Sequence, residues 1–335
     1  MRVPELRYNP VLRDWTMVAS NRQARPDMPS QGCPFCPGSG KVPAQYDVYV
    51  YDNDYPVLSP DPVPPPPPAA ALYRVAPAVG KCEVILYSSD HQAALSRLTL
   101  AQTEAVVRTW RERSLALGAD PHHEYLLIFE NRGREVGATI AHPHGQLYAL
   151  PFVPRKIRTE LEAAEAHHWA TGRCLLCDVS AAELADGRRV LAENARFLAY
   201  IPYFTDFPYG AWISSRAHVP DLQHFTPDDV TALAEILHQV VRGMDALYDK
   251  EFPYMMVLHQ LPLHRPDAAR YYHFHLEFYP PLRDKNKIKF LASAETGAEA
   301  AANPAAVEET AARLRAAIER AARRVPALGD PGRIP

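Results

Sequence analysis

The segment His142-Pro-His-Gly-Gln-Leu-Tyr-Ala-Leu-Pro151 has the composition of a β-strand that begins among polar side chains. Alternate residues of a strand point to the same face of a sheet. We therefore expect His142, His144, Gln146 and Tyr148 to share one face. A row of two imidazoles, an amide and a phenol on one face is typical of a functional site.

A second segment, Tyr272-His-Phe-His-Leu-Glu-Phe-Tyr279, repeats this His-x-His pattern in the other half of the chain. In each half, a Cys-x2-Cys pair and a lone histidine precede the paired histidines. The first set is Cys33, Cys36, His91 and His142, and the second set is Cys174, Cys177, His218 and His273. The same order twice indicates an internal duplication. We predict two half-repeats, residues 1–170 and 171–335.

Both sets have the chemistry of a metal site. Two thiolates and two imidazoles make a tetrahedral Cys2His2 set, which is typical of structural zinc. We therefore predict two zinc sites, closed and without an open position for a catalytic water. The ligands of each set are spread along much of a half-repeat, unlike those of a zinc finger, so a DNA-reading role is not expected.

The composition narrows the class of protein. The 335 residues carry a net charge of −3, without the basic excess of a dedicated nucleic-acid binder. The sequence has no apolar run of membrane-spanning length and no signal peptide, so we expect a cytoplasmic protein with reduced cysteines. The 33 prolines favour strands and extended loops, and the proline-rich residues 60–70 are expected to form an exposed connector.

Hydrophobic periodicity predicts the elements around these motifs. Strands are expected at residues 15–19, 82–87, 125–129, 142–151, 197–201, 211–215, 254–259 and 272–279. Helices are expected at residues 99–117, 157–170, 226–248 and 307–324.

His144 is a core histidine, a third metal ligand or a catalytic group, and its neighbours favour the last. Gly145 is expected to leave room for a ligand to approach the backbone, and Gln146 suits a phosphate oxygen. In the preceding loop, Gly137 and Thr139 offer backbone N–H groups and a hydroxyl, which suit an oxyanion.

The segment His142-Pro-His-Gly-Gln146, preceded by Phe129-Glu-Asn-Arg-Gly133, resembles the signature of the galactose-1-phosphate uridylyltransferases, the transferase branch of the histidine-triad superfamily. Further motifs appear in the family's order over nearly the whole chain. They are Arg22-Gln-Ala-Arg-Pro26, Gly32-Cys-Pro-Phe-Cys36, Asn53-Asp54, Ser89-Asp-His91, His259, His273-Phe-His275, Lys289-Phe-Leu291 and Glu295-Thr-Gly297.

The resemblance implies an α+β fold of two histidine-triad-like half-repeats with antiparallel sheets and packed helices, in a homodimer. It implies ping-pong transfer of UMP from UDP-glucose to galactose 1-phosphate, with His144 as the nucleophile. A backbone carbonyl of the His-Pro-His segment would bind the Nδ1 proton. Gln146 and Thr139 would hold the α-phosphate. The implied substrate-binding residues are Arg22, Arg25, Asn53, Asp54, Asn131, Gly137, Lys289 and Glu295.

Three alternatives remain open. Some family members build the second metal site from residues that correspond to Glu160, His259, His273 and His275, but Cys174 and Cys177 favour the Cys2His2 set. An ADP-glucose phosphorylase-like enzyme would use the same scaffold and would attach AMP to His144. A non-catalytic, zinc-stabilised nucleotide-binding module would need neither His144 nor Gln146. A glutamine found at the hexose site of some members is absent after Glu295, which leaves the sugar specificity open.

Overall fold

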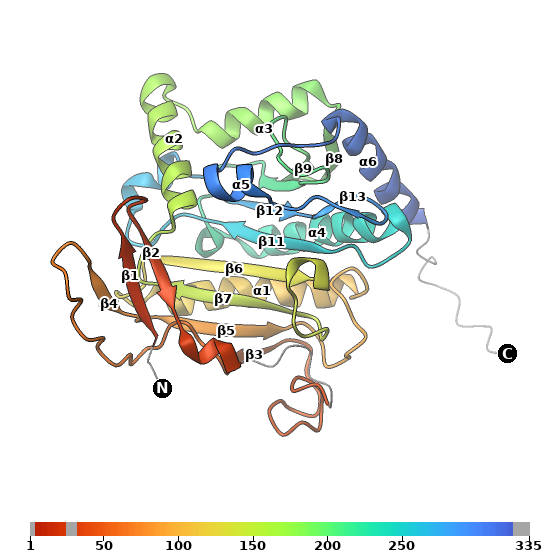
Figure 1. The fold of residues 1–335 in the computed structure, drawn as a ribbon. Helices are drawn as coiled ribbons and strands as arrows, with labels where there is room; N and C mark the ends of the chain where they lie inside the picture. Colours follow the sequence, from red (N-terminus) through yellow and green to blue (C-terminus); the bar gives the residue numbers. More distant parts are fainter. Residues whose placement is uncertain (1–3, 25–31, 324–335) are drawn as a thin grey trace.

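A computed structural model describes residues 4–24 and 32–323 of the chain (Figure 1). Its centre is a nine-stranded sheet in which all paired neighbours are antiparallel. In spatial order the strands are β3 (Tyr49–Asp52), β5 (Lys81–Leu86), β7 (His144–Leu150), β6 (Tyr125–Arg132), β11 (Tyr254–His259), β12 (His275–Tyr279), β10 (Trp212–Ser215), β9 (Phe197–Tyr200) and β8 (Val190–Glu193).

The two halves of the chain meet inside this sheet. Strand β6 of the first half pairs with β11 of the second, from Ile128 opposite Leu258 to Arg132 opposite Tyr254. On either side of this joint lie β7 and β12, which carry His144 and His275. The α+β fold with antiparallel strands and packed helices is confirmed, and the duplicated halves share one continuous sheet.

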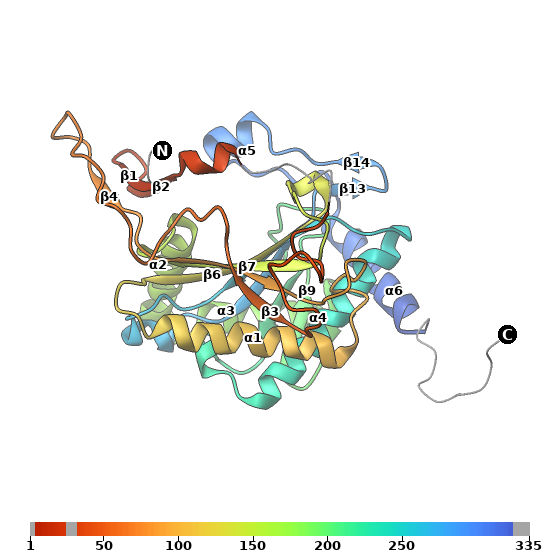
Figure 2. The same ribbon diagram turned by 90° about the horizontal axis from the view of Figure 1, so that it is seen from below.

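One face of the sheet is covered by helices. Figure 2 shows α1 (Leu100–Gly118) and α4 (Pro227–Tyr248) on the same side of the strands, and α6 (Val307–Arg323) packs on α4. Trp110 of α1 is completely buried against this face. Helix α1 begins at Leu100, one residue after its predicted start, because Thr99 caps it in a capping box with Gln102. We call this side the helix face.

The opposite face carries smaller elements, and Figure 2 shows β1, β2 and α5 there. A three-stranded sheet is formed by β2 (Asp14–Val18), β1 (Glu5–Asn9) and β4 (Val75–Pro77). The remaining elements include α2 (Arg155–Thr171), α3 (Leu175–Asp186), α5 (Ser293–Ala298), β13 (Leu282–Asp284) and β14 (Lys287–Ile288). The short 3-10 helices are Ser20–Ala24, Arg134–Val136, Leu222–His224 and Pro266–Arg270.

Two strands begin more than one residue later than predicted. Strand β7 begins at His144 and β12 begins at His275, so His142 and His273 precede the strands instead of lying in them. Pro143 has no N–H for a strand ladder, and the imidazole of His142 turns towards the cysteines. The prediction that His142 lies in the strand is therefore wrong. None of the helices in residues 4–24 and 32–323 combines the length and hydrophobicity that a membrane crossing requires.

Candidate functional site

The first Cys/His group is assembled from three separate segments. The ligand atoms of Cys33, Cys36, His91 and His142 lie within 4.8 Å of one another. The Cys36 Sγ atom is 3.3 Å from His91 Nδ1 and 3.8 Å from His142 Nδ1. His142 Nε2 donates to the Ser88 carbonyl at 2.7 Å, so the lone pair of Nδ1 faces the sulfurs. Burial raises the pKa of the Cys33 thiol to about 11, so a bound cation would be needed to hold it as a thiolate at neutral pH.

The second group has the same construction. Cys174 and Cys177 lie at the start of α3, with the Cys177 Sγ atom 3.3 Å from His273 Nδ1 and 3.7 Å from His218 Nδ1. His218 Nε2 is 2.7 Å from the Ala269 carbonyl oxygen, and His273 Nε2 is 2.9 Å from the carbonyl oxygen of Ser215. Each imidazole again directs Nδ1 to the sulfurs. Both groups therefore fit a tetrahedral, sulfur-rich metal site.

The alternative ligand set for the second metal site, Glu160, His259, His273 and His275, does not come together as one group. His273 lies with the cysteines, whereas Glu160, His259, His275 and Glu277 form a separate group in which Glu160 is half-buried and the other three are buried. Within that group, His259 Nδ1 is 2.9 Å from Glu160 Oε1, and His275 Nε2 is 3.1 Å from Glu277 Oε1. Lys156 Nζ contacts Glu277 Oε2 at 2.8 Å. Lysine and histidine partners thus surround these carboxylates, as in a buried ion network.

His144 stands at the first position of β7, beside the first Cys/His group. Its Nδ1 atom lies 2.7 Å from the carbonyl oxygen of His142. A carbonyl oxygen can only accept, so Nδ1 carries a proton, and in the neutral ring the lone pair is then on Nε2. The Phe35 ring packs 5.8 Å from the His144 ring. This geometry is that of an imidazole held in one tautomer and one orientation.

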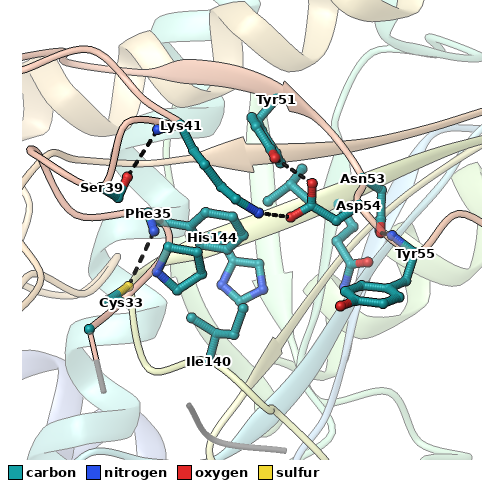
Figure 3. Close-up of a pocket in the computed structure, with 14 residues that line it drawn as sticks. Cys33, Phe35, Ser39, Lys41, Tyr51, Asn53, Asp54, Tyr55, Ile140 and His144 are labelled. Carbon is teal, nitrogen blue, oxygen red and sulfur yellow. Dashed lines mark hydrogen bonds and ion pairs between the residues drawn. The ribbon is translucent and has the colours of Figure 1, made fainter. Parts of the chain in front are cut away.

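A cavity of about 420 Å³ opens in front of His144 (Figure 3). Its walls combine apolar and aromatic side chains with a few polar groups. The lining side chains include Phe35, Lys41, Tyr51, Asn53, Asp54, Tyr55, Val84, Ile140, His144 and Gln146. Lys41 Nζ is 2.7 Å from Asp54 Oδ2, and Asn53 Oδ1 accepts from the Tyr55 N–H at 2.9 Å. The size and mixed lining suit a nucleoside.

A second cavity, of about 540 Å³, reaches His144 from the end of β6. Asn131, Arg132 and Ala138 are among its lining residues. Gly137 adopts a φ of +77°, in the left-handed region that favours glycine, and closes the turn before Thr139. Ala138 and Ile140 of this loop border the cavity beside His144, whereas Gly137 and Thr139 are not among the residues that line it.

The remaining predicted site residues do not all lie at the cavities beside His144. Arg22 Nη1 is 3.4 Å from the Tyr148 hydroxyl, which donates to Gln146 Oε1 at 3.2 Å. Lys289 Nζ lies 3.6 Å from Glu295 Oε1, and Glu295 borders a different cavity of about 860 Å³ that does not include His144. Arg25 lies outside the described residues.

The prediction for Gly145 is wrong. A Cβ atom at this position would lie 2.2 Å from the Tyr87 hydroxyl, so the space beside Gly145 belongs to a buried tyrosine and not to a ligand. Phe35, Lys41, Tyr51 and Tyr55 were missed as cavity residues. Only Phe35, enclosed by the Cys33–Cys36 pair, carried a signal in the sequence.

Comparisons with known proteins cover nearly the whole chain. Residues 1–154 match the family described as galactose-1-phosphate uridyl transferase, N-terminal domain, and residues 160–324 match its C-terminal domain. A galactose-1-phosphate uridylyltransferase of Thermotoga maritima is 40% identical over 93% of this chain and 98% of that protein. The Haemophilus influenzae protein of the same name is 30% identical over 94% of this chain and 95% of its own length.

Solved structures agree with the sequence comparisons. A uridylyltransferase structure superposes with a TM-score of 0.86 at 33% identity, covering 94% of this chain and 99% of that one. An ADP-glucose phosphorylase from Arabidopsis thaliana superposes with a TM-score of 0.72 at 23% identity, over 93% of this chain and 98% of that one. At 23% identity, the similarity to the ADP-glucose phosphorylase shows a shared fold and nothing about the reaction.

Proposed function

Because the chain belongs to the galactose-1-phosphate uridyl transferase family, we propose that it transfers the UMP group of UDP-glucose to galactose 1-phosphate. The observation that carries the proposal is the bond from His144 Nδ1 to the carbonyl oxygen of His142. A proton on Nδ1 would leave the lone pair on Nε2, and this nitrogen is our proposed nucleophile, in the wall of a nucleoside-sized cavity.

The reaction has two steps with one covalent intermediate. His144 Nε2 attacks the α-phosphorus of UDP-glucose, the bond to the bridging oxygen breaks, and glucose 1-phosphate leaves with the electron pair. The imidazole retains its Nδ1 proton and carries a positive charge while UMP is attached. Galactose 1-phosphate then attacks the same phosphorus and takes UMP away, which restores the neutral imidazole.

The surrounding residues support particular roles in this scheme. Gln146 and Thr139 would hold the α-phosphate, while Asn53 and Asp54 would contact the uridine. The further proposed substrate contacts are Arg22, Arg25, Asn131, Gly137, Lys289 and Glu295. Glu295 borders a cavity that does not include His144, and Lys289 is its ion-pair partner. We therefore assign both residues to the hexose phosphate and not to the nucleoside.

We also propose zinc as the metal of both Cys2His2 groups, Cys33/Cys36/His91/His142 and Cys174/Cys177/His218/His273. Four protein ligands of this type close the coordination sphere of zinc and leave no position for substrate. When bound, the metal would supply structural rigidity: it would fix the imidazole of His142, and with it the carbonyl that orients His144.

A homodimer, a cytoplasmic location and a division into half-repeats at residues 170 and 171 stay predictions of the sequence. Sedimentation velocity measures the first of these directly. A monomer at the concentrations at which the enzyme turns over would contradict the homodimer.

The test of the function is a covalent one. The protein is incubated with UDP-glucose alone or with ADP-glucose alone, and its intact mass is measured. We expect a UMP adduct on the wild type and none on His144→Gly. An AMP adduct formed in preference to UMP would favour the phosphorylase reaction, and the lack of any adduct would contradict the transferase proposal.

A further inference from the structure

Gln146 and Tyr148 follow His144 on β7, and alternate residues of a strand share one face of the sheet. Both side chains are buried. The Tyr148 hydroxyl donates to Gln146 Oε1 at 3.2 Å. The same hydroxyl accepts from Arg22 Nη1 at 3.4 Å, and Arg22 lies in the 3-10 helix Ser20–Ala24. These three polar side chains thus form a chain of hydrogen bonds that ends at the residue beside the nucleophile.

The direction of each bond in this chain is fixed by the chemistry of its members. A guanidinium group has only donors, so the Tyr148 oxygen must accept from Arg22. The hydroxyl hydrogen of Tyr148 is directed to Gln146, and only the carbonyl oxygen of the amide can accept it. The Gln146 amide therefore turns Oε1 towards Tyr148 and turns its N–H donors, on Nε2, away from it.

Gln146 and Tyr148 line different cavities. Gln146 borders the nucleoside-sized cavity of about 420 Å³ together with His144. Tyr148 borders the cavity of about 860 Å³ that includes Glu295, and it is not among the residues that line the first cavity. Its ring packs edge-on against the Phe129 ring, with the centroids 5.1 Å apart. Tyr148 is therefore placed to influence a substrate beside His144 through Gln146, and not by contact.

The Tyr148 hydroxyl is not explained by packing. The ring belongs to an apolar cluster that includes Tyr125, Leu150 and Ile157, and a phenylalanine ring would fill the same space. Burying a hydroxyl is unfavourable unless it is hydrogen-bonded. The bonds of this hydroxyl connect it to Arg22 and Gln146, which are both residues of the proposed substrate site.

We propose that Tyr148 is a positioning residue that acts through Gln146, because it holds the amide in the orientation that presents N–H donors to the α-phosphate. This inference rests on the proposed function, in which Gln146 holds that phosphate. An amide turned the other way would present Oε1 to the phosphate oxygens and repel them. Donors that are already oriented need no rearrangement while His144 attacks the phosphorus.

The experiment is a double-mutant cycle on the rate of UMP-adduct formation, measured by rapid-quench intact mass at saturating UDP-glucose. Tyr148→Phe removes the hydroxyl and keeps the ring, and we expect the rate to fall about tenfold, the size of one lost hydrogen bond. Gln146→Ala removes the amide and should slow the reaction at least about a hundredfold. In the Gln146→Ala protein, Tyr148→Phe should change the rate by less than about twofold, because no amide is left to orient.

A second readout separates the orientation of the amide from a general effect on the fold. UDP-glucose with sulfur in place of one non-bridging oxygen of the α-phosphate exists as two diastereomers, and sulfur is a weak hydrogen-bond acceptor. The diastereomer with sulfur facing Gln146 should react more slowly in the wild type. Tyr148→Phe should reduce the rate ratio between the diastereomers at least about threefold. A general loss of activity would slow both equally.

Tyr200→Phe is the matched control, because it removes a buried tyrosine hydroxyl from β9, in the other half of the sheet. The Tyr200 hydroxyl lies 3.0 Å from Ser214 Oγ, and Tyr200 is not among the residues that line either cavity. Its loss should leave the adduct rate and the diastereomer ratio within about twofold of the wild-type values.

The outcomes separate the two proposals. An adduct that never forms in the wild type contradicts the proposed function and, with it, the role of Tyr148. If the adduct forms, a Tyr148→Phe effect that is equally large in the Gln146→Ala protein, or an unchanged diastereomer ratio, overturns the role of Tyr148 alone. If Tyr148→Phe does not fold, as judged from its thermal transition and zinc content, Arg22→Met replaces it in the cycle. Rate losses of Arg22→Met and Gln146→Ala that multiply in full then overturn the role instead.

Discussion

The Nδ1 atom of His144 is bonded to the main chain of His142, and the side chain of His142 belongs to the first Cys/His group. One residue therefore joins the proposed metal site to the proposed nucleophile. The second half repeats the relationship, with His275 Nδ1 lying 3.1 Å from the His273 carbonyl oxygen. There, however, Glu277 lies 3.1 Å from His275 Nε2 and occupies the side from which a phosphate would approach. Both halves therefore keep a backbone carbonyl that holds Nδ1 of the second histidine. The nucleoside-sized cavity described above lies in front of His144.

Loss of the first metal site should impair the chemistry as well as the fold. Cys36→Ser removes a proposed ligand that lies close to both His91 and His142. We expect the zinc content to fall from two equivalents to about one. The rate of UMP-adduct formation should fall at least about tenfold, because His142 would no longer be held in place; residues that orient metal ligands have effects of this size. Metal analysis and rapid-quench mass measurement check both.

Cys174→Ser provides the comparison, because it removes a ligand from the other half-repeat. It should also lose one zinc equivalent, but the folded fraction should form the adduct at a rate close to that of the wild type. Equal losses of adduct formation in the two variants would contradict a specific link between the first site and His144. An unchanged zinc content in Cys174→Ser would point to the Glu160/His259 group instead.

The contact between Gly145 and Tyr87 predicts a rescue experiment. Gly145→Ala places a methyl group 2.2 Å from the Tyr87 hydroxyl, so either the tyrosine or the backbone after His144 must shift. We expect adduct formation to slow at least about tenfold, with about 1–3 kcal/mol of lost stability from overpacking. Adding Tyr87→Phe removes the clashing oxygen and should restore part of both losses.

The double variant decides whether the effect comes from this contact. Tyr87→Phe alone should change the rate by less than Gly145→Ala does. If the double variant is as slow as the two single effects multiplied together, the two residues act independently and the inferred contact does not govern the position of His144.

The features predicted best from the sequence are those that depend on residue types at short, repeated spacings along the chain. The Cys-x2-Cys pairs and their histidines were assigned correctly to two groups, since their order repeats in the two halves. The role of Gly145 was missed because the atom that requires glycine belongs to Tyr87, on a neighbouring strand.

The pairing of whole elements was also beyond the sequence. Nothing in the pattern of β6 or β11 specifies that their edges join the half-sheets, because backbone hydrogen bonds carry little side-chain information. The placement of Lys289 and Glu295 away from the cavity of His144 is likewise a result of tertiary structure.

The ion pair between Arg132 and Asp245 should stabilise the junction of the two halves. Arg132 lies on β6 and Asp245 on α4, with side-chain exposures of 10% and 21%. Asp245→Asn leaves the arginine charge largely buried and without its partner, so we expect the free energy of unfolding to fall by about 3 kcal/mol. Urea denaturation of the metal-loaded protein measures this change.

The exposed pair of Arg108 and Glu104 on α1 is the control, with side-chain exposures of 53% and 31%. Glu104→Gln should change the free energy of unfolding by less than about 0.5 kcal/mol. A similar small effect of Asp245→Asn would mean that this ion pair does not hold the halves together.

Glu130 should make the stability of the protein depend on pH in an unusual direction. Its pKa rises from an ordinary 4.5 to about 7 on burial, so between these values the folded protein binds a proton that the unfolded chain has released. Stability from this group is therefore complete below pH 4.5 and is lost as the pH rises to 7, by about 3 kcal/mol. Most paired carboxylates act in the opposite direction.

Glu130→Gln isolates this contribution, because glutamine keeps the size of the side chain and does not titrate. The difference in unfolding free energy between the wild type and Glu130→Gln should fall by about 3 kcal/mol between pH 4.5 and 7 and then stay constant. Denaturant titrations at each pH, on both proteins with the same zinc content, give that difference. A difference that is flat across this range would show that the carboxyl group titrates near its ordinary pKa and is reached by water in the folded protein.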